Sequence, residues 1–271
     1  MITKDIFNKE NYRGDLLNKI SDYSFSLFKL PSKLNTDFRM KIFFTIFSLL
    51  FIICCSSEKS TNNNDSKTIL WDFNDLDGWV DGSQNNAGPD NYEIINGQLR
   101  IQTLPQSRER AKVRTVDKKY TAGRFNWRVY LPVMGIGDQA SIGAFIYNDD
   151  QHELDFEVEY GKLTDRTALS AQEDDLVLFT TSQDSPYYST KHLLKREQWY
   201  TFAIELSPDK INRTYDATWK VNDTVIDETH LLYGEEVLFY IFCSVENLEF
   251  LGDHIPYQVN YALFDYVEYE P

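Results

Sequence analysis

The sequence predicts an all-β domain in which two antiparallel sheets pack face to face as a β-sandwich of the jelly-roll type. Short segments rich in β-branched and aromatic residues recur along the chain, with turn residues between them. No segment of a dozen residues shows a helical period, and no internal repeat suggests a propeller. About eleven such segments in roughly 200 residues require two sheets that bury their apolar faces against each other.

The expected strands begin at Thr68 and continue to the end of the chain. In order, they are residues 68–73, 92–104, 111–116, 123–132, 140–148, 152–161, 176–181, 199–207, 215–229, 237–245 and 259–270. Two dipeptides within them, Asn96-Gly97 and Asn222-Asp223, are hairpin turn signals. The sequence therefore assigns residues 68–271 to one sandwich domain, and we expect it to be a monomer.

Charge limits the partners of this domain. The chain of 271 residues carries a formal net charge of −15, which opposes binding to the phosphate backbone of a nucleic acid. An anionic polysaccharide would need a local basic cluster to offset the same field, whereas a neutral polymer needs none. The composition therefore excludes a nucleic-acid partner and favours a neutral one.

The segment before the domain carries a targeting pattern. From Met40 the chain has one lysine, a mostly apolar run over residues 42–53, then Cys54 and Cys55 and the polar stretch 56–67. The run is too short to span a bilayer, which takes about 20 residues, and is typical of the apolar region of a secretory signal. Residues 1–39 precede this credible start and are expected to be an extension of the gene model.

Cysteine directly after such a run resembles the lipobox of bacterial lipoproteins. The resemblance implies that the thiol of Cys55, or alternatively of Cys54, is acylated and begins the mature chain. Residues 1–54 would then be the extension and signal peptide, and residues 55–67 a polar tether. We therefore expect a protein of the cell envelope, held to a bacterial membrane by a lipid anchor and either periplasmic or surface-exposed. The other interpretation of the run is a signal anchor or a buried helix.

The segment HELDFEVEYG, residues 152–161, alternates acids with apolar residues. Its acids are Glu153, Asp155, Glu157 and Glu159, and its apolar residues are Leu154, Phe156 and Val158. Since side chains of a strand alternate between its faces, all four carboxylates lie on one face, roughly 7 Å from one to the next, with no base between them. A solvent-facing strand could carry acids for solubility alone, but neighbouring acids without an intervening base repel one another. Glycoside hydrolysis with retention requires such a group of carboxylates.

The residues Glu153-Leu-Asp155-Phe-Glu157 resemble the E-[ILV]-D-x-E signature of glycoside hydrolase family 16, concanavalin-like β-jelly-roll enzymes that act on β-1,3- and β-1,4-linked glucans and galactans. Flanking segments resemble other strands of that family in the same order. They are GRFNWRVYLP (123–132), WYTFAIELSPDKI (199–211), ATWKVNDTVIDET (217–229) and LFDYVEYEP (263–271). The likeness covers about residues 70–271.

The resemblance implies retaining, endo-acting hydrolysis of a β-linked polysaccharide. Carried over position by position, Glu153 is the nucleophile, Glu157 the general acid/base and Asp155 the helper between them. The roles require Glu153 to be ionised for attack and Glu157 to be protonated for donation. Because a retaining pair of carboxyls lies about 5–5.5 Å apart, the strand must curve so that its acidic face is concave.

Around this centre the sequence departs from the family pattern. Arg128 matches an arginine of the family, but Asn126 replaces the usual glutamate, and tryptophans expected near the cleft are missing. Substrate contacts are expected from Asn126, Arg128, Trp127 and Tyr257, with Tyr147, Tyr187 and Tyr188 as further aromatic candidates.

No cofactor is expected for the reaction. Family members often bind a structural calcium on the convex side, and Gly97 (through its carbonyl) and Asp265 stand at the corresponding positions. The alternative function is that of a non-catalytic glycan-binding surface lipoprotein with the same fold.

Overall fold

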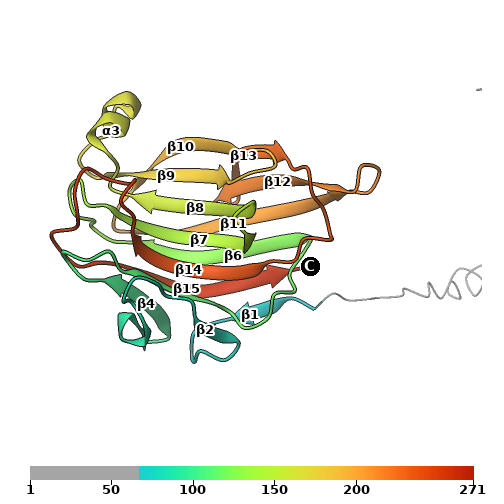
Figure 1. Cartoon of the computed structure of the whole chain (residues 1–271), viewed down its shortest axis with the longest axis horizontal. Helices are drawn as coiled ribbons and strands as arrows, with labels where there is room; N and C mark the ends of the chain where they lie inside the picture. Colours follow the sequence, from blue (N-terminus) through green and yellow to red (C-terminus); the bar gives the residue numbers. More distant parts are fainter. Residues whose placement is uncertain (1–66) are drawn as a thin grey trace, which may run out of the picture. The chain divides into compact units, whose positions relative to one another are not determined.

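The computed structural model describes residues 67–271, which form two antiparallel sheets packed face to face (Figure 1). The eight-stranded sheet has the order β13 (Thr224–His230), β12 (Thr214–Val221), β11 (Gln198–Asp209), β6 (Gly123–Leu131), β15 (Asn260–Glu270), β4 (Gln98–Thr103) and β3 (Tyr92–Ile95), with β1 (Ile69–Trp71) also pairing with β15. The seven-stranded sheet has the order β10 (Tyr188–Lys195), β9 (Asp175–Ser182), β8 (His152–Glu159), β7 (Ala140–Asp149), β14 (Tyr240–Asn247), β5 (Arg110–Thr115) and β2 (Trp79–Asp81). The predicted all-β sandwich is thus confirmed.

The core lies between the sheets and follows from the alternation of the strands. In β8 the side chains of Leu154, Phe156 and Val158 are all fully buried. Phe156 stacks on Phe202 of β11, with ring centroids 4.8 Å apart. Burying an apolar side chain of this size stabilises the fold by about 1.5–3 kcal/mol. The three apolar residues of β8 therefore determine which face of the strand points into the core.

Two buried indoles of the eight-stranded sheet bind the backbone of the opposite sheet. Nε1 of Trp219 in β12 donates to the carbonyl of Asp155 in β8 at 3.1 Å. Nε1 of Trp127 in β6 donates to the carbonyl of Phe242 in β14 at 3.0 Å. A buried indole N–H needs an acceptor, and here each acceptor lies in a strand of the seven-stranded sheet.

A polar network joins the two sheets at one edge. The carboxylate of Asp227 in edge strand β13 accepts hydrogen bonds from Thr180 in β9 and from three residues of edge strand β10: Tyr188, Thr190 and His192. Burial raises the pKa of Asp227, but these hydrogen bonds outweigh it and hold the pKa below its usual value. These side-chain bonds link edge strand β10 of one sheet to edge strand β13 of the other.

Some elements were not anticipated from the sequence. The structure adds β2, β10, the short helix α3 (Leu163–Leu169) and a 3-10 turn at Pro89–Asn91. The segments 92–104 and 215–229 each divide into two strands, at Gly97 and at the Asn222-Asp223 turn. Within residues 67–271, no helix is long and apolar enough to cross a membrane. Cys54 and Cys55, the predicted acylation sites, lie outside the described residues.

Candidate active site

Strand β8 lies near the middle of the seven-stranded sheet, paired with β7 on one side and β9 on the other. Its apolar side chains face the core, so its four acids share the opposite, outer face. Asp155 and Glu159 are buried on this face, whereas Glu153 and Glu157 are partly accessible. The structure thus brings Glu153, Asp155 and Glu157 together in the order expected.

The acids lie in a groove that extends to both sides of Glu157. On the side of β5 is a hollow of about 360 Å³, lined by Glu153 and Glu157 (the β5 hollow). On the side of β10 is a second hollow of about 260 Å³, lined by Glu157 and Glu159 (the β10 hollow). Glu157, Gln183 and Phe250 line both hollows, so Glu157 stands where they meet.

Small residues lie between Glu157 of β8 and Lys112 of β5. Across the sheet, Glu157 pairs with Gly143 of β7, Gly143 with Ser244 of β14, and Ser244 with Lys112 of β5. A Cβ atom at Gly143 would collide with the hydroxyl of Ser244, so the glycine is required for this close approach. One row further along the strands, the rings of Phe145 and Phe242 stack at 4.6 Å and border the hollow.

Crowding of the carboxyls shifts their proton affinity. Burial, followed by the nearby Asp155 and Glu246 carboxylates, raises the pKa of Glu153 to about 8. Two cations, Lys112 and Arg110, act on Glu153 in the opposite direction. The four carboxyls of the strand cannot all be ionised near neutral pH, because each charge is poorly hydrated and repels its neighbours.

Glu157 also holds its proton more firmly than an exposed glutamate does. Burial raises its pKa well above the usual value, and nearby carboxylates raise it further, in the order Asp155, Glu246, Glu153 and Glu159. No cation is among its main influences. Glu153 and Glu157 therefore differ in one respect: two basic side chains are among the main influences on the pKa of Glu153, whereas burial and carboxylates are the main influences on that of Glu157.

Asp155, between Glu153 and Glu157 in the strand, is held in place by hydrogen bonds to its side chain and its backbone. Burial raises its pKa to about 7, although the hydrogen bond from Gln183 opposes the rise. Its Oδ2 accepts a hydrogen bond from Nε2 of Gln183 at 3.1 Å, and its backbone carbonyl accepts the indole N–H of Trp219. Its buried Oδ1 has no hydrogen-bond partner within residues 67–271.

Glu159, the fourth acid of β8, is buried. It is 1% exposed in the wall of the β10 hollow, and its Oε2 has no partner in the described part of the chain. Burial, followed by the nearby Asp165, raises its pKa to about 8, against the opposing effect of Lys162 and Lys191.

Three residues expected to contact substrate lie elsewhere, which corrects the sequence-based placement. Asn126, Trp127 and Arg128 belong to β6 of the eight-stranded sheet. The amide of Asn126 donates to Glu268 and Glu270, Trp127 is in the core, and the guanidinium of Arg128 lies 5.7 Å from the ring centroid of Trp199. The GRFNWRVYLP pattern identified a strand of the fold, and pattern alone cannot tell which sheet that strand joins.

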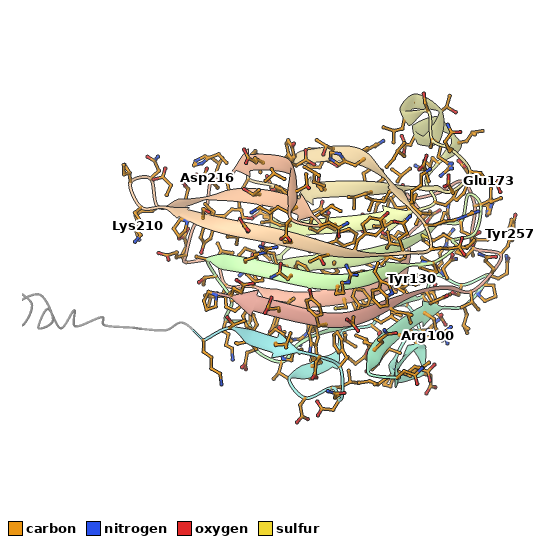
Figure 2. The ribbon with its side chains drawn as sticks, turned by 180° about the vertical axis from the view of Figure 1, so that it is seen from behind. Arg100, Tyr130, Glu173, Lys210, Asp216 and Tyr257 are labelled. Carbon is orange, nitrogen blue, oxygen red and sulfur yellow. The ribbon has the colours of Figure 1, made fainter. Side chains whose placement is uncertain are left out.

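Tyr257 lies in the loop after β14, which also carries Phe250. Its exposed ring stacks on His254 at 4.2 Å and lines neither hollow. Figure 2 shows Tyr257 and Glu173 at one end of the molecule and Lys210 at the other. The exposed aromatic rings of the groove itself are Tyr187 and Phe250, both in the β10 hollow.

Sequence reasoning named Tyr147 and Tyr187, which line the β5 hollow and the β10 hollow respectively, but it missed other groove residues outside β8. These are the basic side chains of β5, Glu246 of β14 and Phe250 of the following loop. The alternation of bases and apolar residues over residues 110–114 was the available signal for the first of these.

The two predicted calcium ligands lie close together in the fold. Phe264 pairs with Leu99, so the next residue, Asp265, stands beside the β3–β4 turn that contains Gly97. A carboxylate and a backbone carbonyl are oxygen donors of the kind that Ca²⁺ takes. Residues 67–271 contain no group of three or more His, Cys, Asp or Glu side chains arranged to hold a metal, so calcium binding there stays a prediction.

The sequence matches no protein-family model and no curated protein. The structure is similar to a laminarinase from Flavobacterium sp. UMI-01 (TM-score 0.56, 13% identity, 76% of this chain and 100% of that chain). It is also similar to the β-glucanase of Bacillus licheniformis (TM-score 0.52, 15% identity, 75% and 98%) and to the Crh5 transglycosylase (TM-score 0.54, 15% identity, 75% and 83%). Residues 67–271 therefore have the β-sandwich fold of these laminarinase and β-glucanase structures.

Proposed function

We propose that this protein is a retaining, endo-acting glycoside hydrolase of the family 16 type that cleaves a β-linked polysaccharide. The observation that carries the proposal is that Glu153, Asp155 and Glu157 alternate along one face of β8, with both glutamates lining a groove. The laminarinase-like fold supports it, since the same architecture serves enzymes of this chemistry. Fold alone does not determine function, so the proposal rests on the site.

The division of roles follows from the surroundings of the two glutamates. Glu153 has Lys112 and Arg110 to favour its ionised form, which suits attack on the anomeric carbon. Burial and nearby carboxylates raise the pKa of Glu157, so it retains its proton, which suits donation to the leaving oxygen. Once the glycosyl–enzyme has formed, the deprotonated Glu157 takes a proton from the water that hydrolyses it.

Asp155 acts on the geometry and charge of its neighbours. Its free Oδ1 gives it one position from which to share a proton with Glu153, while Gln183 holds its other oxygen. On a flat strand the backbones of Glu153 and Glu157 would be roughly 13 Å apart, so their side chains must lean together to reach a retaining separation. The Glu153 carboxylate raises the pKa of Glu157, which supports such convergence.

The groove supports endo action, because hollows lie on both sides of Glu157 and can hold sugars before and after the bond that is cleaved. The alternative is that the protein binds glycans without cleaving them. One observation favours the alternative: burial keeps the pKa of Glu153 near 8, so the nucleophile is largely protonated at neutral pH before a ligand binds.

Activity on a polysaccharide panel tests the proposal. Laminarin, lichenan, agarose, carrageenan and xyloglucan should be screened for new reducing ends, with the anomer formed followed by NMR. We expect release of oligosaccharides with retained configuration from at least one polymer.

Substitution of the acids separates their roles. Glu153→Gln should abolish turnover of every substrate. Glu157→Gln should lower turnover of the polymer by about 10²–10⁴-fold, the usual contribution of a general acid. Aryl glycosides with good leaving groups should partly escape the second defect only. Glu228→Gln, at an exposed position of β13 in the other sheet, is the control and should leave turnover unchanged. A parent protein that binds polymer but cleaves none would support the glycan-binding alternative instead.

A further inference from the structure

The wall of the β5 hollow is basic in an otherwise acidic protein. Arg110, Lys112 and Arg114 alternate along β5 and line the hollow, whereas Ala111 and Val113 between them are buried in the core. The chain as a whole carries a net charge of −15. A row of three bases on the face that also bears the acids of β8 is therefore the local exception to the field of the molecule.

Four carboxylates line the same hollow (Asp150, Glu153, Glu157 and Glu246), but within residues 67–271 only Glu246 forms an ion pair with this row. Oε2 of the buried Glu246 accepts from both Nε of Arg110 and Nζ of Lys112, so one carboxylate serves two cations. Arg114 has no carboxylate within salt-bridge distance in residues 67–271; it lies 4.2 Å from the ring centroid of Tyr240 and donates one N–H to the carbonyl of Thr115. A guanidinium has five N–H donors in a fixed fork, so Arg114 retains donors for a ligand.

The basic row stands at a defined place relative to the acids. Lys112 lies in the same cross-strand row as Glu157, and Arg114 in the row of Asp155, each three strands from β8. Three strand spacings correspond to roughly 14 Å on a flat sheet. A polysaccharide chain lying across the strands with its reacting bond at Glu157 would therefore bring another of its sugars to the basic row.

We propose that the β5 hollow binds an anionic substituent, a sulfate ester or a uronate carboxylate, on a sugar of the polysaccharide. The inference rests on the proposed function, because it assumes that the chain lies in the groove over β8. Arg114 provides the bidentate donor pair that such oxyanions accept, and Arg110 and Lys112 add positive charge. The substrate is accordingly an acidic β-linked polysaccharide rather than a neutral glucan.

Binding to a non-cleaving variant tests this inference. In the Glu157→Gln background, affinity electrophoresis should compare agarose, which is neutral, with carrageenan, which carries sulfate esters, and hyaluronan, which carries carboxylates. We expect one of the two anionic polymers to bind at least tenfold more tightly than agarose, with the difference shrinking as salt is raised. Preference between carrageenan and hyaluronan identifies the anion.

A matched pair of arginine substitutions assigns the site. Arg114→Gln should weaken binding of the preferred polymer by about tenfold, the effect of losing a charged hydrogen-bonding partner. Arg110→Gln should weaken it as well, and provides a second variant if loss of the Arg114–Tyr240 contact impairs folding. Arg128→Gln changes the net charge equally but lies on the eight-stranded sheet, and should bind like the background. Thermal melting checks that each variant is folded.

The outcomes separate the two proposals. Equal binding of the Arg114→Gln and Arg128→Gln variants, or preference for agarose, overturns the anion site whether or not the parent protein hydrolyses a polymer. Binding of an anionic polymer through Arg114 without any hydrolysis by the parent upholds the anion site and rejects the catalytic proposal.

Discussion

The indole of Trp219 links the candidate active site to the sheet behind it. Its Nε1 donates to the carbonyl of Asp155, the residue between the proposed nucleophile and acid. Trp127 makes the equivalent bond to the carbonyl of Phe242 in β14, which lies two strands from β8 in the same sheet. Both tryptophans are fully buried and donate to a backbone carbonyl of the other sheet, but only Trp219 bonds the strand that carries the acids.

Because only Trp219 bonds the backbone of Asp155, we expect matched substitutions of the two tryptophans to differ in their effect on catalysis. Trp219→Phe and Trp127→Phe each keep an aromatic ring and leave a buried carbonyl without its donor, so each should lower the free energy of unfolding by about 1–3 kcal/mol. Only Trp219→Phe should also lower kcat on the cleaved polymer by more than tenfold, because it frees the backbone of Asp155. The measurements are urea unfolding and initial rates for both variants. Equal kcat values for the two would show that this bond contributes stability alone.

Strand β8 carries its acids at a cost in stability that depends on pH. The folded protein raises the pKa of Glu153 from 4.5 to about 8, so between these pH values it binds more protons than the unfolded chain does. Stability from this group is then fully present below about pH 4.5 and is lost as the pH rises through about 8.

We therefore expect Glu153→Gln, which cannot ionise, to be more stable than the parent at pH 8 by on the order of 1–2 kcal/mol and about equally stable at pH 4. Urea unfolding at the two pH values measures the difference. Glu228→Gln, in the exposed part of β13, is the control and should show no such change between the two pH values. A gain of the same size for Glu153→Gln at pH 4 would contradict the ionisation account.

The elements differ in how far the sequence predicts them. The acids and apolar residues of β8 alternate without exception, so its phase, its buried face and its site could be read directly. β10 has mostly half-buried residues and the mixed sequence YSTKHLLK, because it is an edge strand held by side-chain bonds to Asp227, which no local pattern encodes.

The residues around the acids were harder to predict for a related reason. Arg110 and Lys112 share a face with the acids of β8 because β5 belongs to the same sheet, with β14 and β7 between the two strands. That strand order is set by pairings between segments far apart in sequence. The same fact explains the misplacement of Asn126 and Arg128, whose strand joins the other sheet. Local pattern thus determines the face of a side chain, and sheet order determines its neighbours.

At the scale of the whole protein, attachment to a membrane is a prediction from the sequence. If the signal is processed at the lipobox-like cysteines, mass spectrometry of the mature protein should find an acylated N-terminus at Cys55, or at Cys54 if cleavage falls one residue earlier. Cys55→Ala should abolish acylation and release the protein from the membrane fraction, whereas Cys54→Ala should not. A membrane-bound chain that retains residues 1–54 would instead indicate a signal anchor.

Because β1 pairs with β15, the two ends of the domain lie side by side, and the chain could begin and end elsewhere while each strand keeps its place in the sheets. Ile69 pairs with Tyr269, so the first and last strands of the domain are already neighbours in one sheet. A short peptide joining those ends, with new ends opened at the exposed turn around Asn212, would yield a circular permutant with every strand pair kept. The turn follows Lys210, at the end of the molecule opposite Tyr257 (Figure 2), so the permutant would leave the loop that bears Phe250 intact.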